Sequence, residues 1–210
     1  MADANLTPKM GRIGIYSGTF DPIHVGHVEF ALTALKECAL DKVIFLTESS
    51  PREKTTVSSS SDREAMIQIA IAGNSKLGIL SLSDKQFSVK DTLPQLQLLY
   101  PGSALVFLMG SDLTRTFTHR WEGLDILLRS VELAIGLRAQ DTAKDVSDIL
   151  EALAKEYKIA PRYTNIPSPR VHLASTNIRQ GTHDITDVDP NVADYIVQKG
   201  LYEGSSPENV

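Results

Sequence analysis

The stretch that decides the fold is residues 14–27, which read Gly-Ile-Tyr-Ser-Gly-Thr-Phe-Asp-Pro-Ile-His-Val-Gly-His. An apolar run over residues 13–16 has the composition of a buried strand. The run breaks at Gly18, passes a turn marked by Asp21-Pro22 and enters an apolar-periodic segment near His24. The pattern predicts a strand, a short loop and then the start of a helix.

The start of this helix has the properties of an anion-binding site. Main-chain N–H groups and the helix dipole favour a negative charge there, and the glycines let the backbone come close to it. His24 and His27 lie three residues apart, so their rings project from one face and each can donate a hydrogen bond to a phosphoryl oxygen. Gly26 between them removes a side chain that could block a ligand. The alternative is an ordinary strand-to-helix turn with two solvated histidines.

Length and composition limit the class of protein. A chain of 210 residues is long enough for one large α/β domain or two small ones, and a net charge of −5 argues against non-specific binding of nucleic acid. No stretch approaches the roughly 18 apolar residues of a membrane span, and residues 1–10 lack the apolar core of a signal peptide. The single cysteine, Cys38, excludes an intrachain disulfide and reads as a core thiol. We therefore expect a cytoplasmic protein with no membrane or nucleic-acid partner.

Strand-like and helical patterns alternate along the chain, which predicts βαβ units and a parallel sheet. The expected strands are residues 13–16, 42–46, 77–82, 105–109, 132–137 and 171–173. The expected helices are residues 25–38, 61–72 with a capping box at Ser61, 91–99, 124–129, 145–157 and 190–199 with Asp189 as N-cap and Gly200 as stop. Residues 47–61 read as a long exposed loop. We expect an α/β protein with a Rossmann-like, doubly wound, mostly parallel sheet and helices on both faces.

This fold is expected in a single domain over residues 1–210, with a disordered tail from about residue 204. Open α/β sheets bind ligands at the carboxyl ends of their strands. A second candidate element, Ser175-Thr176-Asn177-Ile178-Arg179, follows the last expected strand. Its hydroxyls, main-chain N–H groups and guanidinium together suit a triphosphate. Taken alone, the same pattern is also that of a capped helix.

Both elements resemble the motifs of a known family. Gly-Thr-Phe-Asp-Pro-x-His-x-Gly-His at residues 18–27 resembles the signature of the HxGH nucleotidyltransferase superfamily. Residues 174–179 resemble its Ser-Ser-Thr-x-Ile-Arg motif, with Ala174 in place of the first serine. Over residues 12–202 the chain resembles bacterial nicotinate-nucleotide adenylyltransferases. That resemblance also involves Asp91-Thr92-Leu93, Tyr100-Pro101, Gly110-Ser111-Asp112, Trp121, Tyr195-Ile196 and Leu201-Tyr202.

The resemblance implies an enzyme of NAD biosynthesis that joins ATP and nicotinate mononucleotide to give nicotinate adenine dinucleotide and pyrophosphate, with Mg²⁺ accompanying ATP. It implies catalytic roles for His24, His27 and Arg179. The ATP-binding residues that it implies are Ser17, Gly18, Thr19, Phe20, Gly26, Lys54, Gly110, Asp112, Ser175, Thr176 and Ile178. The acceptor nucleotide is expected at Thr92, Trp121 and Arg52, with Trp121 stacked on the pyridine ring. The metal is expected on phosphate oxygens, without dedicated protein ligands.

Several alternatives stay open at this point. Trp121 also suits a core anchor on a helix, and Asp112 suits a helix N-cap. Residues 51–54 read Pro-Arg-Glu-Lys where the family has Pro-Pro-His-Lys, and residues 87–90 read Phe-Ser-Val-Lys where it often has Ser-Tyr-Thr-x. Both segments border the acceptor in the family. The acceptor could therefore be nicotinamide mononucleotide or phosphopantetheine, or the chain could be an inactive nucleotide-binding regulator. Homo-oligomerisation is also open.

Overall fold

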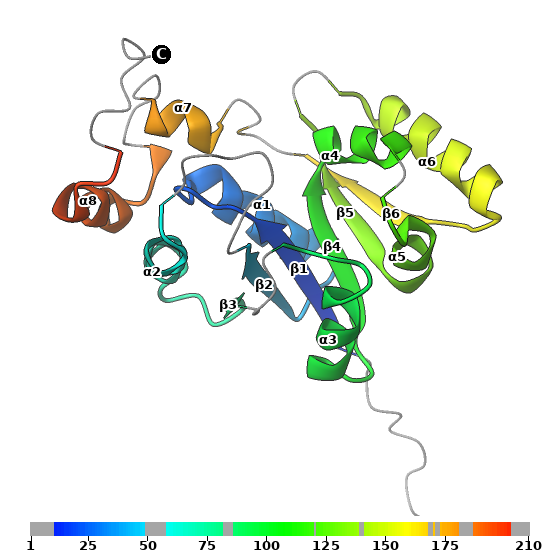
Figure 1. Ribbon diagram of the computed structural model, residues 1–210, viewed down its shortest axis with the longest axis horizontal. Coiled ribbons are helices and arrows are strands. Elements are labelled where there is room, and N and C mark those ends of the chain that lie inside the picture. Colours follow the sequence, from blue (N-terminus) through cyan, green and yellow to red (C-terminus); the bar gives the residue numbers. More distant parts are fainter. Residues whose placement is uncertain are drawn as a thin grey trace, which may run out of the picture.

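A parallel sheet lies at the centre of the computed structural model (Figure 1), which describes residues 11–48, 58–81, 86–119, 121–138, 141–167, 170, 173–180 and 187–202. The strands in these residues are β1 (Arg12–Gly18), β2 (Lys42–Thr47), β3 (Leu77–Ser81), β4 (Ala104–Gly110), β5 (Glu132–Gly136) and β6 (Arg162–Ile166). They lie in the order β3-β2-β1-β4-β5-β6, and each pair of neighbours is parallel. This is the strand order of a doubly wound sheet, so the expected fold class is confirmed.

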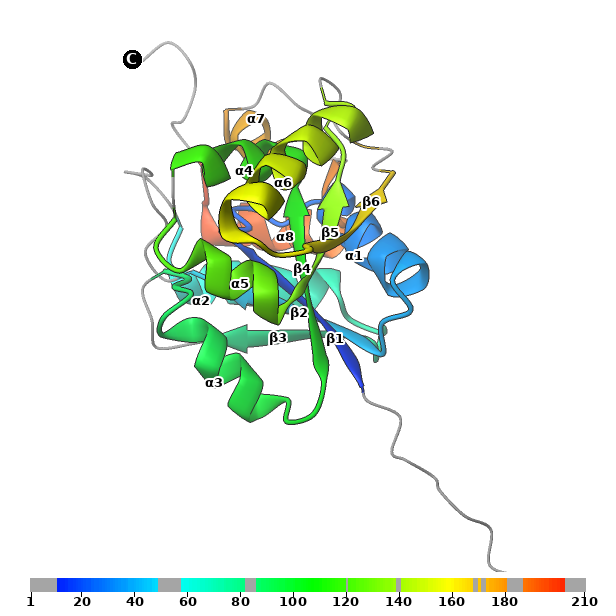
Figure 2. The same ribbon diagram turned by 90° about the vertical axis from the view of Figure 1, so that its right-hand side faces the viewer.

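Helices cover both faces of the sheet, as Figure 2 shows. The helices on one face are α1 (Val25–Glu37), α2 (Ser60–Ala70), α7 (Ser175–Arg179) and α8 (Pro190–Lys199). The other face carries α3 (Thr92–Leu99), the 3₁₀ helix η1 (Phe117–His119), α5 (Leu124–Ser130) and α6 (Ala143–Tyr157), while α4 (Ser111–Thr116) directly follows β4. Among the helices of the described residues, none has both the length and the apolar character that crossing a membrane requires.

The central strand β1 is fixed by apolar packing on both of its faces. Successive side chains of a strand point to opposite sides, so Ile15 lies in the core layer with α3, α5 and α6, whereas Tyr16 packs against the layer with α1, α2 and α8. Cys38 is buried in the latter layer, as expected of a core thiol. The carboxyl end of β1, which leads into the motif at residues 18–27, therefore has a well-defined position.

The sequence predicted most elements correctly and the last strand wrongly. The sixth strand is β6 (Arg162–Ile166), whose alternating exposed and half-buried side chains lack an apolar run. Leu173 lies outside any strand, and the other two residues of the expected strand, 171 and 172, lie outside the described residues. The N-cap of α2 is Ser59, which accepts a hydrogen bond from the Asp62 amide, and not Ser61. Most of the expected loop (residues 49–57) and the tail from residue 203 also lie outside the described part.

Candidate active site

The loop between β1 and α1 is buried over most of its length. Phe20, Asp21 and His24 all have 5% or less of their surface exposed. Phe20 has a φ angle of +50°, in the left-handed region that non-glycine residues rarely adopt. A Cβ atom at Gly18 would lie 2.9 Å from Cζ of Phe20, so the ring of Phe20 packs directly over the glycine. The sequence needs glycine here because of this close approach.

The two histidines of the motif stack on each other at the start of α1. His24 is the N-cap of the helix, and its ring lies 3.6 Å from that of His27 with an interplanar angle of 18°. The main-chain N–H of His24 donates to Nδ1 of His27 at 3.2 Å. Because Nδ1 accepts this bond, the proton of the neutral imidazole is on Nε2. The structure thus fixes both the orientation of His27 and the nitrogen that donates.

Packing and charge at the start of α1 suit an anion beside these rings. The first turn of α1 contains no acidic residue, which leaves the positive end of the helix dipole uncompensated. A Cβ atom at Gly26 would lie 3.2 Å from the His24 ring, so this glycine gives the ring its room. The ring of Phe20 meets that of His27 edge-on, with centroids 5.2 Å apart. The ring of Phe20 therefore packs against His27 and supports its orientation.

The second motif lies directly on the loop of the first. The Ser175 hydroxyl donates to the carbonyl oxygen of Pro22 at 2.9 Å. Arg179 donates from Nη1 to the carbonyl oxygen of Asp21 at 2.5 Å and from Nη2 to Oγ1 of Thr176 at 3.2 Å. Ile178 differs from its neighbours because its side chain is 7% exposed and lies in the core layer with α1 and α8. The structure brings Ser175, Thr176 and Arg179 to the site, while Ile178 packs beneath it.

A small cavity of about 40 Å³ lies beside the two histidines. Its lining residues are Tyr16, His24, Gly26, His27, Phe30, Gly110, Gly136, Arg138 and Arg170. Arg138 follows β5 at the same edge of the sheet, and its Nε lies 3.5 Å from Oδ1 of Asp112. Nε of Arg170 lies 2.9 Å from the carboxylate of Glu29. Sequence reasoning missed both cations, although the position of Arg138 after a strand end was a signal that could have found it.

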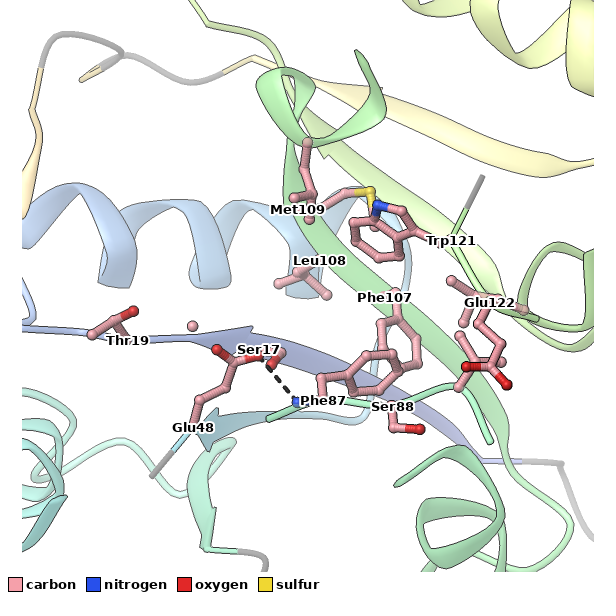
Figure 3. Close-up of a pocket in the computed structure, with 14 residues that line it drawn as sticks. Ser17, Thr19, Glu48, Phe87, Ser88, Phe107, Leu108, Met109, Trp121 and Glu122 are labelled. Atoms are coloured by element: carbon pink, nitrogen blue, oxygen red, sulfur yellow. Dashed lines mark hydrogen bonds between the residues drawn. The ribbon is translucent and has the colours of Figure 1, made fainter. Parts of the chain in front are cut away.

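A larger cavity of about 520 Å³ lies on the other side of the loop and is drawn in Figure 3. Its lining residues are Ser17, Gly18, Thr19, Glu48, Phe87, Ser88, Val89, Phe107, Leu108, Met109, Leu113, Trp121, Glu122 and Leu127. The rings of Phe87 and Phe107 meet edge-on at 5.0 Å. Glu48 accepts a hydrogen bond from the Phe87 amide at 3.1 Å, which holds that segment against the end of β2. Flat apolar walls of this kind suit an aromatic ring.

The two cavities flank the end of β1. Ser17, Gly18 and Thr19 line the larger one, while Tyr16 and the histidines line the smaller one. Consecutive residues of one strand end, Tyr16 and Ser17, therefore line different cavities. Such an arrangement suits two ligands that react with each other across the loop.

Comparisons with known proteins agree with this geometry. Residues 15–181 match the family model described as cytidylyltransferase-like. A probable nicotinate-nucleotide adenylyltransferase of Neisseria meningitidis serogroup A is 31% identical over 199 residues, covering 92% of this chain and 100% of the relative. One of Desulfitobacterium hafniense is 35% identical over 208 residues, covering 94% of this chain and 98% of the relative. The chain belongs to the nicotinate-nucleotide adenylyltransferases of the cytidylyltransferase-like family. It is a nucleotidyltransferase, and the resemblance noted in its sequence is confirmed.

Solved structures of the family have the same fold. The chain superposes on Plasmodium falciparum nicotinic acid mononucleotide adenylyltransferase complexed with NaAD with a TM-score of 0.72. The two sequences are 22% identical, and the alignment covers 91% of this chain and 97% of the other. A second structure of that enzyme, complexed with APC, gives the same TM-score. At this level of identity the likeness establishes the α/β architecture.

The three residues predicted to bind the acceptor differ in where they lie relative to the larger cavity. Trp121 lines the larger cavity, lies between η1 and α5 outside any helix, and packs edge-on against Phe117 at 5.1 Å. It is therefore not on a helix, although it does pack against the core layer with α3, α5 and α6. Thr92 is buried and is not part of the cavity wall, but its Oγ1 accepts from the Ser88 amide at 3.0 Å and so supports the segment that is. Arg52 lies outside the described residues.

Two predicted ATP-binding residues lie where β4 passes into α4, and another falls outside the described residues. Gly110 is the N-cap of α4, so Asp112 lies in the first turn of that helix and is not its cap. The Asp112 side chain is 63% exposed and faces Arg138 at the edge of the smaller cavity. Lys54 lies outside the described part of the chain.

Proposed function

We propose that the protein transfers the adenylyl group of ATP to nicotinate mononucleotide, forming nicotinate adenine dinucleotide and pyrophosphate. The observation that carries this proposal is a pair of cavities that flank the end of β1, one beside the stacked histidines and the other with aromatic walls. The acceptor is supported by the relatives, which are named nicotinate-nucleotide adenylyltransferases. We assign the reaction to the cytoplasm because the single cysteine is a buried thiol, which suits a reducing compartment.

The reaction is an in-line displacement at phosphorus. A phosphate oxygen of the mononucleotide attacks the α-phosphorus of ATP, and the bond to the bridging oxygen of the β-phosphate breaks, so that pyrophosphate leaves with the electron pair. The attacking phosphate already carries its negative charge, and therefore no covalent enzyme intermediate and no general base are required. The work of the protein is to position the two substrates and to stabilise charge.

The stacked histidines stabilise the charge on the transferred group. Nε2 of His27 carries a proton because Nδ1 accepts from the His24 amide, so the ring presents a donor to an α-phosphoryl oxygen. His24 donates beside it to the α- and β-phosphates. The backbone of Ser17, Gly18 and Thr19 approaches the triphosphate between the two cavities. Gly26 keeps the His24 ring in place at the start of α1, where the helix dipole favours the anion.

Arg179 holds the end of the triphosphate that leaves. A guanidinium has five N–H donors, so its bonds to Asp21 and Thr176 are compatible with further bonds to the β- and γ-phosphates. Ser175 and Thr176 contribute hydroxyls beside it. Asp112, with Gly110, binds the ribose of ATP. Lys54 remains a predicted contact to ATP, and Arg52 remains a predicted contact to the acceptor nucleotide.

Mg²⁺ enters as part of the MgATP substrate. This ion keeps most of its water ligands and binds phosphate oxygens, so it requires few protein ligands. No group of three or more His, Cys, Asp or Glu side chains in the described residues could hold a metal.

The assay that tests this proposal is release of pyrophosphate from MgATP with three acceptors: nicotinate mononucleotide, nicotinamide mononucleotide and phosphopantetheine. We expect a strong preference for the nicotinate form. Preference for either of the other acceptors would support adenylyl transfer but would show that the assigned acceptor is wrong. ATP binding without turnover of any acceptor would contradict the proposal and favour a regulatory protein.

Replacement of His27 tests the catalytic assignment. Loss of one donor to the developing charge costs on the order of 2.7–4 kcal/mol in the transition state, so His27→Ala should lower kcat about 10²-fold or more. The matched control is His119→Ala, which removes the same ring from the exposed end of η1 and should leave kcat within a factor of about two. Near-normal turnover in a folded His27→Ala variant would rule out the assigned role.

Replacement of Trp121 tests the position of the acceptor ring. Stacking of a base on an aromatic side chain is worth about 1–3 kcal/mol, so Trp121→Ala should raise the KM for the mononucleotide about ten-fold or more and change the KM for ATP little. Trp121→Phe keeps an aromatic surface and should retain most of the affinity. Equal weakening of both substrates by Trp121→Ala, or loss of folding, would instead indicate a purely structural tryptophan.

A further inference from the structure

A tyrosine at the far end of the chain contacts the loop that carries the motif. Tyr202 follows α8 and lies 181 positions from Asp21 in the sequence. Its hydroxyl donates to Oδ1 of Asp21 at 2.7 Å. Its ring packs against the core layer with α1, α2 and α8. Replacement of Tyr202 by phenylalanine removes the hydroxyl and keeps the ring, so the bond to Asp21 can be tested without losing this packing.

Asp21 is a buried carboxylate held by several elements. It has no exposed surface, and its second oxygen accepts from the Ser58 amide at 3.2 Å. Arg63, itself fully buried on α2, donates to the carbonyl oxygen of Thr19 at 3.0 Å. Arg179 donates to the carbonyl oxygen of Asp21 and lies 4.0 Å from its carboxylate. A buried charge is stable only with such partners, so Asp21 and the loop carbonyls are held as one network.

This network is needed because the loop adopts a disfavoured conformation. Phe20, next to Asp21, has its φ angle at +50°, and a non-glycine residue keeps such an angle only where the surroundings determine it. His24 lies three residues after Asp21 and is the N-cap of α1. A shift of the Asp21 side chain therefore moves the backbone from which both histidines project.

We propose that Tyr202 is a positioning residue for adenylyl transfer, whose hydroxyl fixes Asp21 and, through Asp21, the loop that presents His24 and His27. This proposal rests on the proposed function and gives the segment after α8 a part in catalysis. Burial and the nearby Asp21 carboxylate raise the pKa of Tyr202, although a hydrogen bond with Ser58 acts in the opposite direction. The hydroxyl therefore remains protonated, and remains a donor, at neutral pH.

The chain contains a matched control for this bond. Tyr195, on α8, donates its hydroxyl to Oδ1 of Asp62 at 2.9 Å. This is also a bond from a tyrosine to an aspartate, and it joins α8 to the first turn of α2. Tyr195→Phe thus removes the same type of bond from the same end of the chain without touching the loop.

The test compares Tyr202→Phe with Tyr195→Phe in the full-length protein. Tyr202→Phe should lower kcat about ten-fold, the loss expected for one hydrogen bond to a charged group, with the KM of the acceptor within about two-fold of wild type. Tyr195→Phe should keep the kcat of wild type. Tyr202→Phe should lower the unfolding midpoint more than Tyr195→Phe, because it takes a donor from a fully buried carboxylate, so kcat is measured well below both midpoints. Equal kcat values for the two variants would overturn the proposal.

A double-mutant cycle and hydrogen exchange complete the test. Since Tyr202 acts through Asp21, the double variant Tyr202→Phe with Asp21→Asn should turn over no more slowly than Asp21→Asn alone. Amide exchange in residues 19–27 should accelerate in Tyr202→Phe and not in Tyr195→Phe. Unchanged amide exchange in residues 19–27 would overturn the positioning role, and this result could be read even if the wild-type protein turned over none of the three acceptors. That failure of wild type would itself reject only the proposed function.

Discussion

The carboxylate of Asp21 is fully buried in the loop after β1, and a buried negative charge persists only where donors surround it. The donors come from distant parts of the chain: the amide of Ser58 before α2 and the hydroxyl of Tyr202 after α8. Arg63 and Arg179 add positive charge and bind loop carbonyls. The loop that carries the histidines thus has its shape before a nucleotide arrives, and preorganisation of this kind lowers the cost of binding the transition state.

The topology explains why this loop borders two cavities. In the order β3-β2-β1-β4-β5-β6, β1 lies where the direction of winding reverses, and the helices after β1 and β4 leave from opposite faces of the sheet. Side chains near the end of β1 therefore reach both sides. Tyr16 faces the histidines and Ser17 faces the aromatic cavity. A single strand end thus lies between the sites we assign to the two substrates.

The sequence predicted the elements that have strong local signals. The central motif was recognisable from its glycines, from Asp21-Pro22 and from both histidines. The caps of α8 are Asp189 and Gly200, as expected. Local pattern was insufficient where tertiary context decides. The strand β6 lacks an apolar run. Ile178 belongs to a phosphate-type motif but packs in the core, and Thr92 supports a cavity wall without being part of it.

The polar network around Asp21 could not be predicted from the sequence for a different reason. Its bonds join residues separated by 37 to 181 positions, and no periodicity links positions so far apart. Arg63 lies in the helix that the sequence predicts over residues 61–72, but nothing in that pattern indicates that its side chain is fully buried. Only the folded chain brings it to the carbonyl of Thr19. Residues that position a site through other residues are thus the hardest to find by pattern.

The most direct test of this account is a crystal structure with MgATP in which a methylene group replaces the oxygen between the α- and β-phosphates. We predict an α-phosphoryl oxygen about 2.7–3.2 Å from Nε2 of His27, with Arg179 on the β- and γ-phosphates. The bonds from Tyr202 and Arg63 to the loop should be unchanged. A triphosphate bound away from the histidines, or a loop that releases these bonds and refolds around the nucleotide, would contradict the account.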